Sequence, residues 1–304
     1  MTEIVNVESL RKAYGPSEVL KGVDLKIYPS EVLGFVGRNG AGKSTFIHII
    51  TGITHKSSGN FKIFGHSDAL TTNVKSKLGV MPDVSNLYDH MKGIAFLKYM
   101  GELAGDKRKK KEYERLFIEV GLEGAENKRI KSYSFGMKKK ICIAQALLGN
   151  PQLIILDEPT SGVDPESAIK IRELILKLKN EGKTILLTSH NLEEIDKVSD
   201  RVAILSNGVI KKVGTPEELK LKNDSAIEFL IRTKPQLLKE HVVKLIDNYG
   251  FPVSFIRNNK NYTHLTIENE EAIPDLTEKL ISDGISIYEL KIKEQSLEEI
   301  FMTV

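Results

Sequence analysis

One short segment constrains the fold of this chain more than any other feature. It fits the pattern G-x-x-x-x-G-K-[ST] of a phosphate-binding loop, and its residues are Gly37, Arg38, Asn39, Gly40, Ala41, Gly42, Lys43 and Ser44. The apolar run 31–36 before it predicts a buried strand, and the run 45–50 after it, ended by Gly52, predicts a helix. Strand, loop and helix in this order are the context in which such a segment binds phosphate.

The residue types in this loop suit phosphate chemistry. Glycines let backbone N–H groups surround the phosphates, and the N-terminus of the following helix adds partial positive charge. We expect Lys43 to reach the terminal phosphates, Ser44 to hold Mg²⁺, and Thr45 to complete the binding segment. The similar letters at 182–184 lack a leading glycine and precede a strand, so they predict an ordinary turn.

Composition sets broad limits on the class of protein. The chain has 304 residues, of which 40% are hydrophobic and 28% charged, enough for two soluble domains. A net charge of +3 is too small to indicate a nucleic-acid partner. The single cysteine, Cys142, excludes a disulfide framework and is expected to be a small core residue. No signal pattern and no membrane-spanning run is found, so any membrane role would require a partner subunit.

The order of patterns predicts an α/β domain over residues 1–222. Strands are expected at 4–10 and 19–27, around a turn at 13–16, and a helical subdomain at about 84–150. Farther on, strands and helices alternate, which favours a largely parallel sheet with helices on both faces. These elements are strands 153–157, 184–188 and 201–205 and helices 165–180 and 191–198.

The last part of the chain, residues 223–304, predicts a second domain. Its pattern reads strand, helix, two strands around a turn at 258–261, helix and strand, which is the βαββαβ order of a ferredoxin-like fold. A final helix is expected at about 295–302. This part carries no phosphate motif, so two roles stay open: regulation or dimerisation, and passive packing.

Two carboxylates follow an apolar strand at 153–156. A phosphate-loop enzyme needs such an element, with Asp157 in the Mg²⁺ shell and Glu158 placed to orient or deprotonate a water. Asp-Glu after a strand is also a common solvated turn. Its position after a phosphate loop and before the segment 159–162 favours the chemical role.

Over residues 1–220 the chain closely resembles the nucleotide-binding subunits of ABC transporters. The segment 133–137, Tyr-Ser-Phe-Gly-Met, lies where that family has its Leu-Ser-Gly-Gly-Gln signature, between the phosphate loop and the acidic strand. The segment 161–164, ending in Asp164, matches the family's D-loop, and His190 matches its switch histidine. Tyr14 stands where the family stacks an aromatic ring on adenine.

The resemblance implies a P-loop NTPase fold and two chains that enclose two ATP molecules. Ser134 and the Gly136 N–H would face the γ-phosphate held by Lys43 of the other chain. The N-terminus of a helix favours such an anion, because it carries partial positive charge. His190 would contact the γ-phosphate and couple it to Glu158. The pair could be a homodimer or a heterodimer with another ATPase subunit.

Some positions depart from the family pattern. The signature has Phe135 for glycine and Met137 for glutamine, and Asp83 stands in place of the Q-loop glutamine. We expect Asp83 to join Ser44 and Asp157 as a metal ligand, since carboxylates bind Mg²⁺ well. A solvated turn aspartate after proline is the alternative.

The signature and the final segment 296–301 are similar to those of bacterial exporters of antibiotics, drugs and peptides. The resemblance therefore implies the ATPase subunit of such an exporter, cytoplasmic and held on the inner face of the membrane by separate permease subunits. Two alternatives stay open: the ATPase of an importer, and a soluble ABC protein that acts on ribosomes, DNA or an assembly scaffold. Importer subunits often carry an all-β tail, and the soluble classes carry a second cassette or long coiled-coil arms, none of which this chain predicts.

Overall fold

The computed structural model describes residues 2–67, 71–220, 227–293 and 296–303. The chain forms two compact units, Met1–Pro216 with Phe301–Val304, and Glu217–Ile300. The expected domain boundary at 222/223 lies outside the described residues. Within the described part, no helix combines the length and the apolar character needed to cross a membrane.

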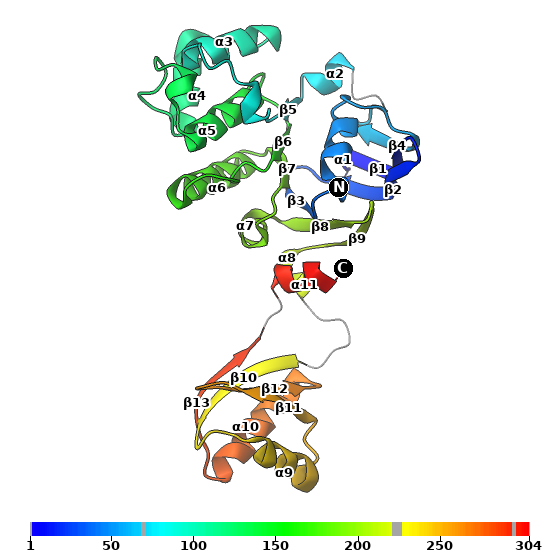
Figure 1. The fold of residues 1–304 in the computed structure, drawn as a ribbon, viewed down its shortest axis with the longest axis vertical. Coiled ribbons are helices and arrows are strands. Elements are labelled where there is room, and N and C mark those ends of the chain that lie inside the picture. Colours follow the sequence, from blue (N-terminus) through cyan, green and yellow to red (C-terminus); the bar gives the residue numbers. More distant parts are fainter. Residues whose placement is uncertain (1, 68–70, 221–226, 294–295, 304) are drawn as a thin grey trace. The chain divides into compact units, whose positions relative to one another are not determined.

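A six-stranded sheet forms the centre of the first unit (Figure 1), with the strand order β5-β6-β7-β3-β8-β9. Five strands are parallel to their neighbours and β9 pairs antiparallel with β8. The sequence patterns predict the parallel arrangement correctly, whereas β9 is an addition. The strands are β3 (Val32–Gly37), β5 (Leu78–Val80), β6 (Leu153–Asp157), β7 (Thr184–Thr188), β8 (Arg201–Ser206) and β9 (Val209–Gly214).

Helices cover both faces of this sheet, as predicted. On one face the ring of Phe35 in β3 packs against Phe46 of α1 (Lys43–Ile50), with ring centroids 4.8 Å apart. On the other face Gly34 lies against Ile195 of α7 (Leu192–Val198), because side chains alternate along a strand. Helix α6 (Pro165–Asn180) lies on the same side as α7 (Figure 1).

A smaller antiparallel sheet packs on the α1 side. Its strand order is β2-β1-β4, with β1 (Val5–Tyr14), β2 (Ser17–Ile27) and β4 (Ser58–Ile63). Buried side chains of this sheet form one apolar cluster with those of α1 and β3. The first two strands extend farther than the sequence predicts, so that the expected turn at 13–16 is confined to Gly15 and Pro16.

Helices dominate the region between β5 and β6. Tyr113, Leu116 and Phe117 are buried on α4, as their helical spacing predicts. Cys142 is fully buried in α5, so its expected role as a core residue is correct. The elements are η1 (Val84–Asn86), α3 (Gly93–Leu103), α4 (Lys110–Glu119), η2 (Ile130–Ser132) and α5 (Phe135–Ala146). Three further helices of the chain are α2 (Thr72–Lys75), α8 (Pro216–Lys220) and α11 (Leu297–Thr303).

The second unit has the predicted βαββαβ order. Its four strands are antiparallel in the order β11-β12-β10-β13, and its helices pack on one face around a separate apolar core. The first helix of this unit, α9, begins at Lys239. The elements are β10 (Ile227–Lys234), α9 (Lys239–Tyr249), β11 (Val253–Asn258), β12 (Thr263–Ile267), η3 (Glu270–Ala272), α10 (Ile273–Ser282) and β13 (Ser286–Ile292).

Candidate nucleotide site

The phosphate loop connects β3 to α1, as the sequence predicts. Gly42 takes the N-cap position of α1 with a φ of 112°, and no side chain caps the helix there. A Cβ atom on Gly42 would lie 2.6 Å from Cδ2 of Leu20, so the backbone geometry and the packing both require glycine. The N–H groups at the start of α1 are therefore available to an anion.

Lys43 and Ser44 begin this helix. The ammonium of Lys43 donates to the carbonyl oxygen of Gly37 at 2.6 Å and lies 3.5 Å from that of Arg38, so it reaches back across the loop. The side chain of Ser44 is exposed on the first turn. The phosphate role of Lys43 and the metal role of Ser44 stay predictions.

The acidic residues lie at the same sheet edge as the loop. Strand β7 pairs with β6 on one side and β3 on the other, so the carboxyl ends of the three parallel strands meet there. The hydroxyl of Thr188, at the end of β7, donates to Oδ1 of Asp157 and accepts from the N–H of Glu158 at 3.0 Å. Thr188 is fully buried, and it orients both acidic residues. The sequence patterns did not single it out.

Glu158 adopts an unusual backbone conformation. Its φ of 51° is left-handed, a region that costs free energy for a residue with a side chain. Its carboxylate Oε2 lies 2.7 Å from Nδ1 of His190, and the ammonium of Lys139 donates to its carbonyl oxygen at 2.7 Å. The predicted pair Glu158 and His190 is thus in contact, and Lys139 is a partner that the sequence patterns did not reveal.

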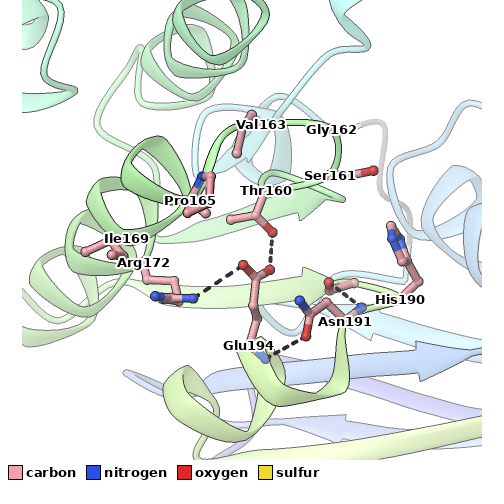
Figure 2. A pocket seen from close by; sticks show the side chains of 12 residues that line it. Thr160, Ser161, Gly162, Val163, Pro165, Ile169, Arg172, His190, Asn191 and Glu194 are labelled. Atoms are coloured by element: carbon pink, nitrogen blue, oxygen red, sulfur yellow. Dashed lines mark hydrogen bonds and ion pairs between the residues drawn. The ribbon is translucent and has the colours of Figure 1, made fainter.

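A cavity of about 390 Å³ lies between the segment 160–163 and the segment 189–191 (Figure 2). Glu194 of α7 lines this cavity, and its carboxylate accepts a hydrogen bond from the hydroxyl of Thr160. Its other oxygen lies 3.4 Å from Nη1 of Arg172 on α6. The side chain of Asn191 caps α7 by accepting from the backbone N–H of Glu194. The Glu194 carboxylate connects Thr160, which directly precedes the D-loop segment 161–164, to the helix that follows His190.

The signature segment begins helix α5. The hydroxyl of Ser134 accepts from the N–H of Met137 at 3.2 Å and caps the helix. Gly136 lies close to Ser167 of α6, since a Cβ atom on it would come within 2.9 Å of the Ser167 hydroxyl. Asp164 caps α6 by accepting the Ser167 N–H, and hydrogen bonding to Ser167 lowers the pKa of Asp164. Two helix N-termini therefore lie side by side.

Tyr14 and Asp83 lie in two different places, at the end of β1 and at the start of η1. Tyr14 is half-exposed at the end of β1, with the ammonium of Lys12 at 4.7 Å from its ring centroid. Asp83 caps the short helix η1 through the N–H of Ser85 at 2.7 Å, and hydrogen bonding to Ser85 lowers its pKa. Asp83 is thus an ionised turn residue here, and its role as a metal ligand stays a prediction.

Two family models match the chain. Residues 20–161 match the ABC transporter model, and residues 214–304 match the model of the C-terminal domain of DrrA1-3-like ATP-binding proteins. The bacitracin transport ATP-binding protein BcrA of Bacillus licheniformis is 30% identical over 307 residues, which covers 99% of this chain and 97% of that protein. The chain is an ABC transporter ATP-binding protein. Like other members of that family, it is an ATPase that binds ATP.

A second relative matches nearly the whole chain, and a solved structure matches a large part of it. The linearmycin resistance ATP-binding protein LnrL of Bacillus subtilis (strain 168) is 29% identical over 306 residues, 99% of this chain and 98% of that protein. A solved ATP-binding subunit of an ABC transporter is 31% identical, covers 71% of this chain and 92% of its own, and superimposes with a TM-score of 0.64. The predicted P-loop ABC fold is therefore confirmed. ABC ATP-binding proteins work with membrane permease subunits and dimerise.

Proposed function

We propose that this ABC protein hydrolyses ATP to drive the efflux of an antibiotic, drug-like or peptide substrate through separate permease subunits. The observation that carries the proposal is similarity over the whole length, tail included, to proteins named for bacitracin transport and linearmycin resistance. The protein would work at the inner face of the membrane, as a homodimer or with a second ATPase subunit. The βαββαβ unit would serve regulation or dimerisation.

The chain's own residues supply the parts of a hydrolytic site. The loop from Gly37 to Thr45 would hold the phosphates through its N–H groups, with Lys43 at the terminal phosphates. Glu158 would orient the attacking water and accept its proton, and the contact between its carboxylate and Nδ1 of His190 supports this role. Tyr14 would stack on adenine. Ser134 and Gly136 would bind the γ-phosphate of the partner chain, next to Asp164.

Oxygen donors at the sheet edge fit a magnesium ion. The carboxylate of Asp157 and the hydroxyl of Ser44 are hard ligands of the kind that Mg²⁺ takes. The ion would neutralise charge on the phosphates.

We extend this set of metal ligands to Asp83, whose lowered pKa keeps it ionised. In Asp83→Asn and Asp83→Ala variants, the half-maximal ATPase rate should require more Mg²⁺, alanine more than asparagine. Identical Mg²⁺ curves would leave Asp83 with its capping role alone.

The transport role is tested by what the protein binds in its own cell. A tagged chain, purified from detergent-solubilised membranes of its native bacterium, should bring multi-span membrane proteins with it. Deletion of the gene should sensitise the cell to peptide antibiotics, and wild type should restore resistance while Lys43→Ala does not. Recovery with ribosomal RNA, and no membrane protein, would favour a soluble ABC role instead.

A further inference from the structure

Lys139 is a buried lysine on the signature helix. It lies one turn after Phe135 on α5, and only 9% of its surface is exposed. A buried ammonium requires a polar partner, because desolvation of a charge is costly. The partner is the carbonyl oxygen of Glu158, to which Nζ donates at 2.7 Å. A side chain of the signature helix therefore holds the backbone of the predicted catalytic residue.

The backbone at Glu158 needs such support. Its left-handed φ of 51° persists only where the surroundings fix it. The N–H of Glu158 donates to the hydroxyl of Thr188 at 3.0 Å, which fixes one side of the residue. Lys139 fixes the other side through the carbonyl. Because the backbone sets where a side chain starts, this contact helps to aim the Glu158 carboxylate at His190.

Phe135 lies next to Lys139. The ammonium of Lys139 lies 5.7 Å from the centroid of its ring, a cation–π distance. The same ring lies against Gly162, where a Cβ atom would come within 3.0 Å of its Cε1. The phenylalanine that replaces a signature glycine thus joins the start of α5 to the D-loop segment within one chain.

We propose that Lys139 is a positioning residue for ATP hydrolysis. This proposal rests on the proposed role of Glu158. Lys139 ties the helix that begins at Ser134 to the Glu158 backbone in the same chain. When Ser134 engages the nucleotide held by the partner chain, the helix and the glutamate then move together. The signature helix acts in this way on the chain's own hydrolytic site as well as on its partner's.

The test compares Lys139→Met, Lys139→Gln and Lys139→Arg with wild type. Loss of a hydrogen bond from a charged donor should lower kcat on the order of 10-fold in the Met variant. The KM for ATP should stay unchanged, because nucleotide contacts are intact. Arginine should restore most of kcat, since it can donate to the same carbonyl. Lys139→Gln provides a second neutral side chain if the Met variant folds poorly.

Lys138→Met is the matched control on the same helix. The ammonium of Lys138 pairs with Asp89 at 2.8 Å, so its loss should leave kcat near wild type. In a Glu158→Gln background, Lys139→Met should still form the ATP-dependent dimer at the same ATP concentration. A purely structural lysine would instead lower the melting temperature and weaken that dimer together with kcat.

Two results would overturn the proposal. One is full kcat in both Lys139→Met and Lys139→Gln, and the other is a loss of kcat only in step with lost folding or dimerisation. The single variant Glu158→Gln shows whether a negative result concerns Lys139 or the proposed function itself. If Glu158→Gln is inactive while Lys139→Met is fully active, only the positioning role of Lys139 is wrong. Full turnover by Glu158→Gln would remove the premise itself.

Discussion

Nδ1 of His190 lies 2.7 Å from Oε2 of Glu158, and the backbone nitrogen of His190 donates to the same oxygen at 3.4 Å. The imidazole is exposed while the carboxylate is largely covered. The histidine therefore lies on the open side of the glutamate, where it can contact a nucleotide and the carboxylate at once.

Replacement of His190 by alanine should remove this support. We expect kcat to fall on the order of 100-fold, as for loss of a group that assists proton transfer, with ATP binding retained. Steady-state ATPase rates and ATP binding by the single chain give the two quantities. His55→Ala is the control, because His55 is also exposed but far along the chain from both residues. Equal losses in both variants would argue against a specific role.

Ser134→Arg should separate binding from turnover. A bulky cation at the start of α5 would block the predicted contact with the partner chain's γ-phosphate, while the variant's own phosphate loop stays intact. ATP binding should persist and turnover should be lost. In a Glu158→Gln background, size-exclusion chromatography should show no ATP-dependent dimer. An unchanged dimer would rule out the shared site.

Glu194 should contribute to the stability of the first unit. Alanine at this position leaves the hydroxyl of Thr160 and the guanidinium of Arg172 without their acceptor (Figure 2). We expect the free energy of unfolding to drop by about 1–3 kcal/mol, the cost of partly buried polar groups left unpaired. Glu193→Ala is the control, because Glu193 lies on the same first turn of α7 and its side chain is exposed. Equal melting temperatures for the two variants would contradict the connection.

Cys142 should report on folding. Burial raises the pKa of its thiol to about 12, so the reactive thiolate is scarce at pH 8. Iodoacetamide should leave the native protein unlabelled at that pH and label it in denaturant. Mass spectrometry gives the fraction labelled. Fast labelling of the native protein would mean that α5 is not packed as described.

Much of the fold could be predicted from local patterns. The phosphate loop, the end of β6 with Asp157 and Glu158, and the cap Asp164 each depend on neighbouring residues, and each lies where the sequence predicts. The tail order was also visible, since alternating and helical spacings are local. The sequence patterns do not predict β9, because apolar and polar residues do not alternate along Val209–Gly214.

Contacts between distant segments could not be predicted in this way. Thr188 and Lys139 lie 30 and 19 positions from Glu158, and only the folded sheet and helix bring them to its backbone. Lys139 does interrupt an otherwise apolar helix face, which is a signal of a buried charge with a partner. The identity of that partner depends on tertiary structure.

Glu158→Gln tests the central claim most directly. The substitution keeps the size of the side chain and removes its ability to accept a proton. Phosphate release from radiolabelled ATP and retained nucleotide should be measured on the same preparation. The variant should bind ATP as wild type does, form a stable dimer with it and release almost no phosphate. Wild-type phosphate release by Glu158→Gln would contradict the account.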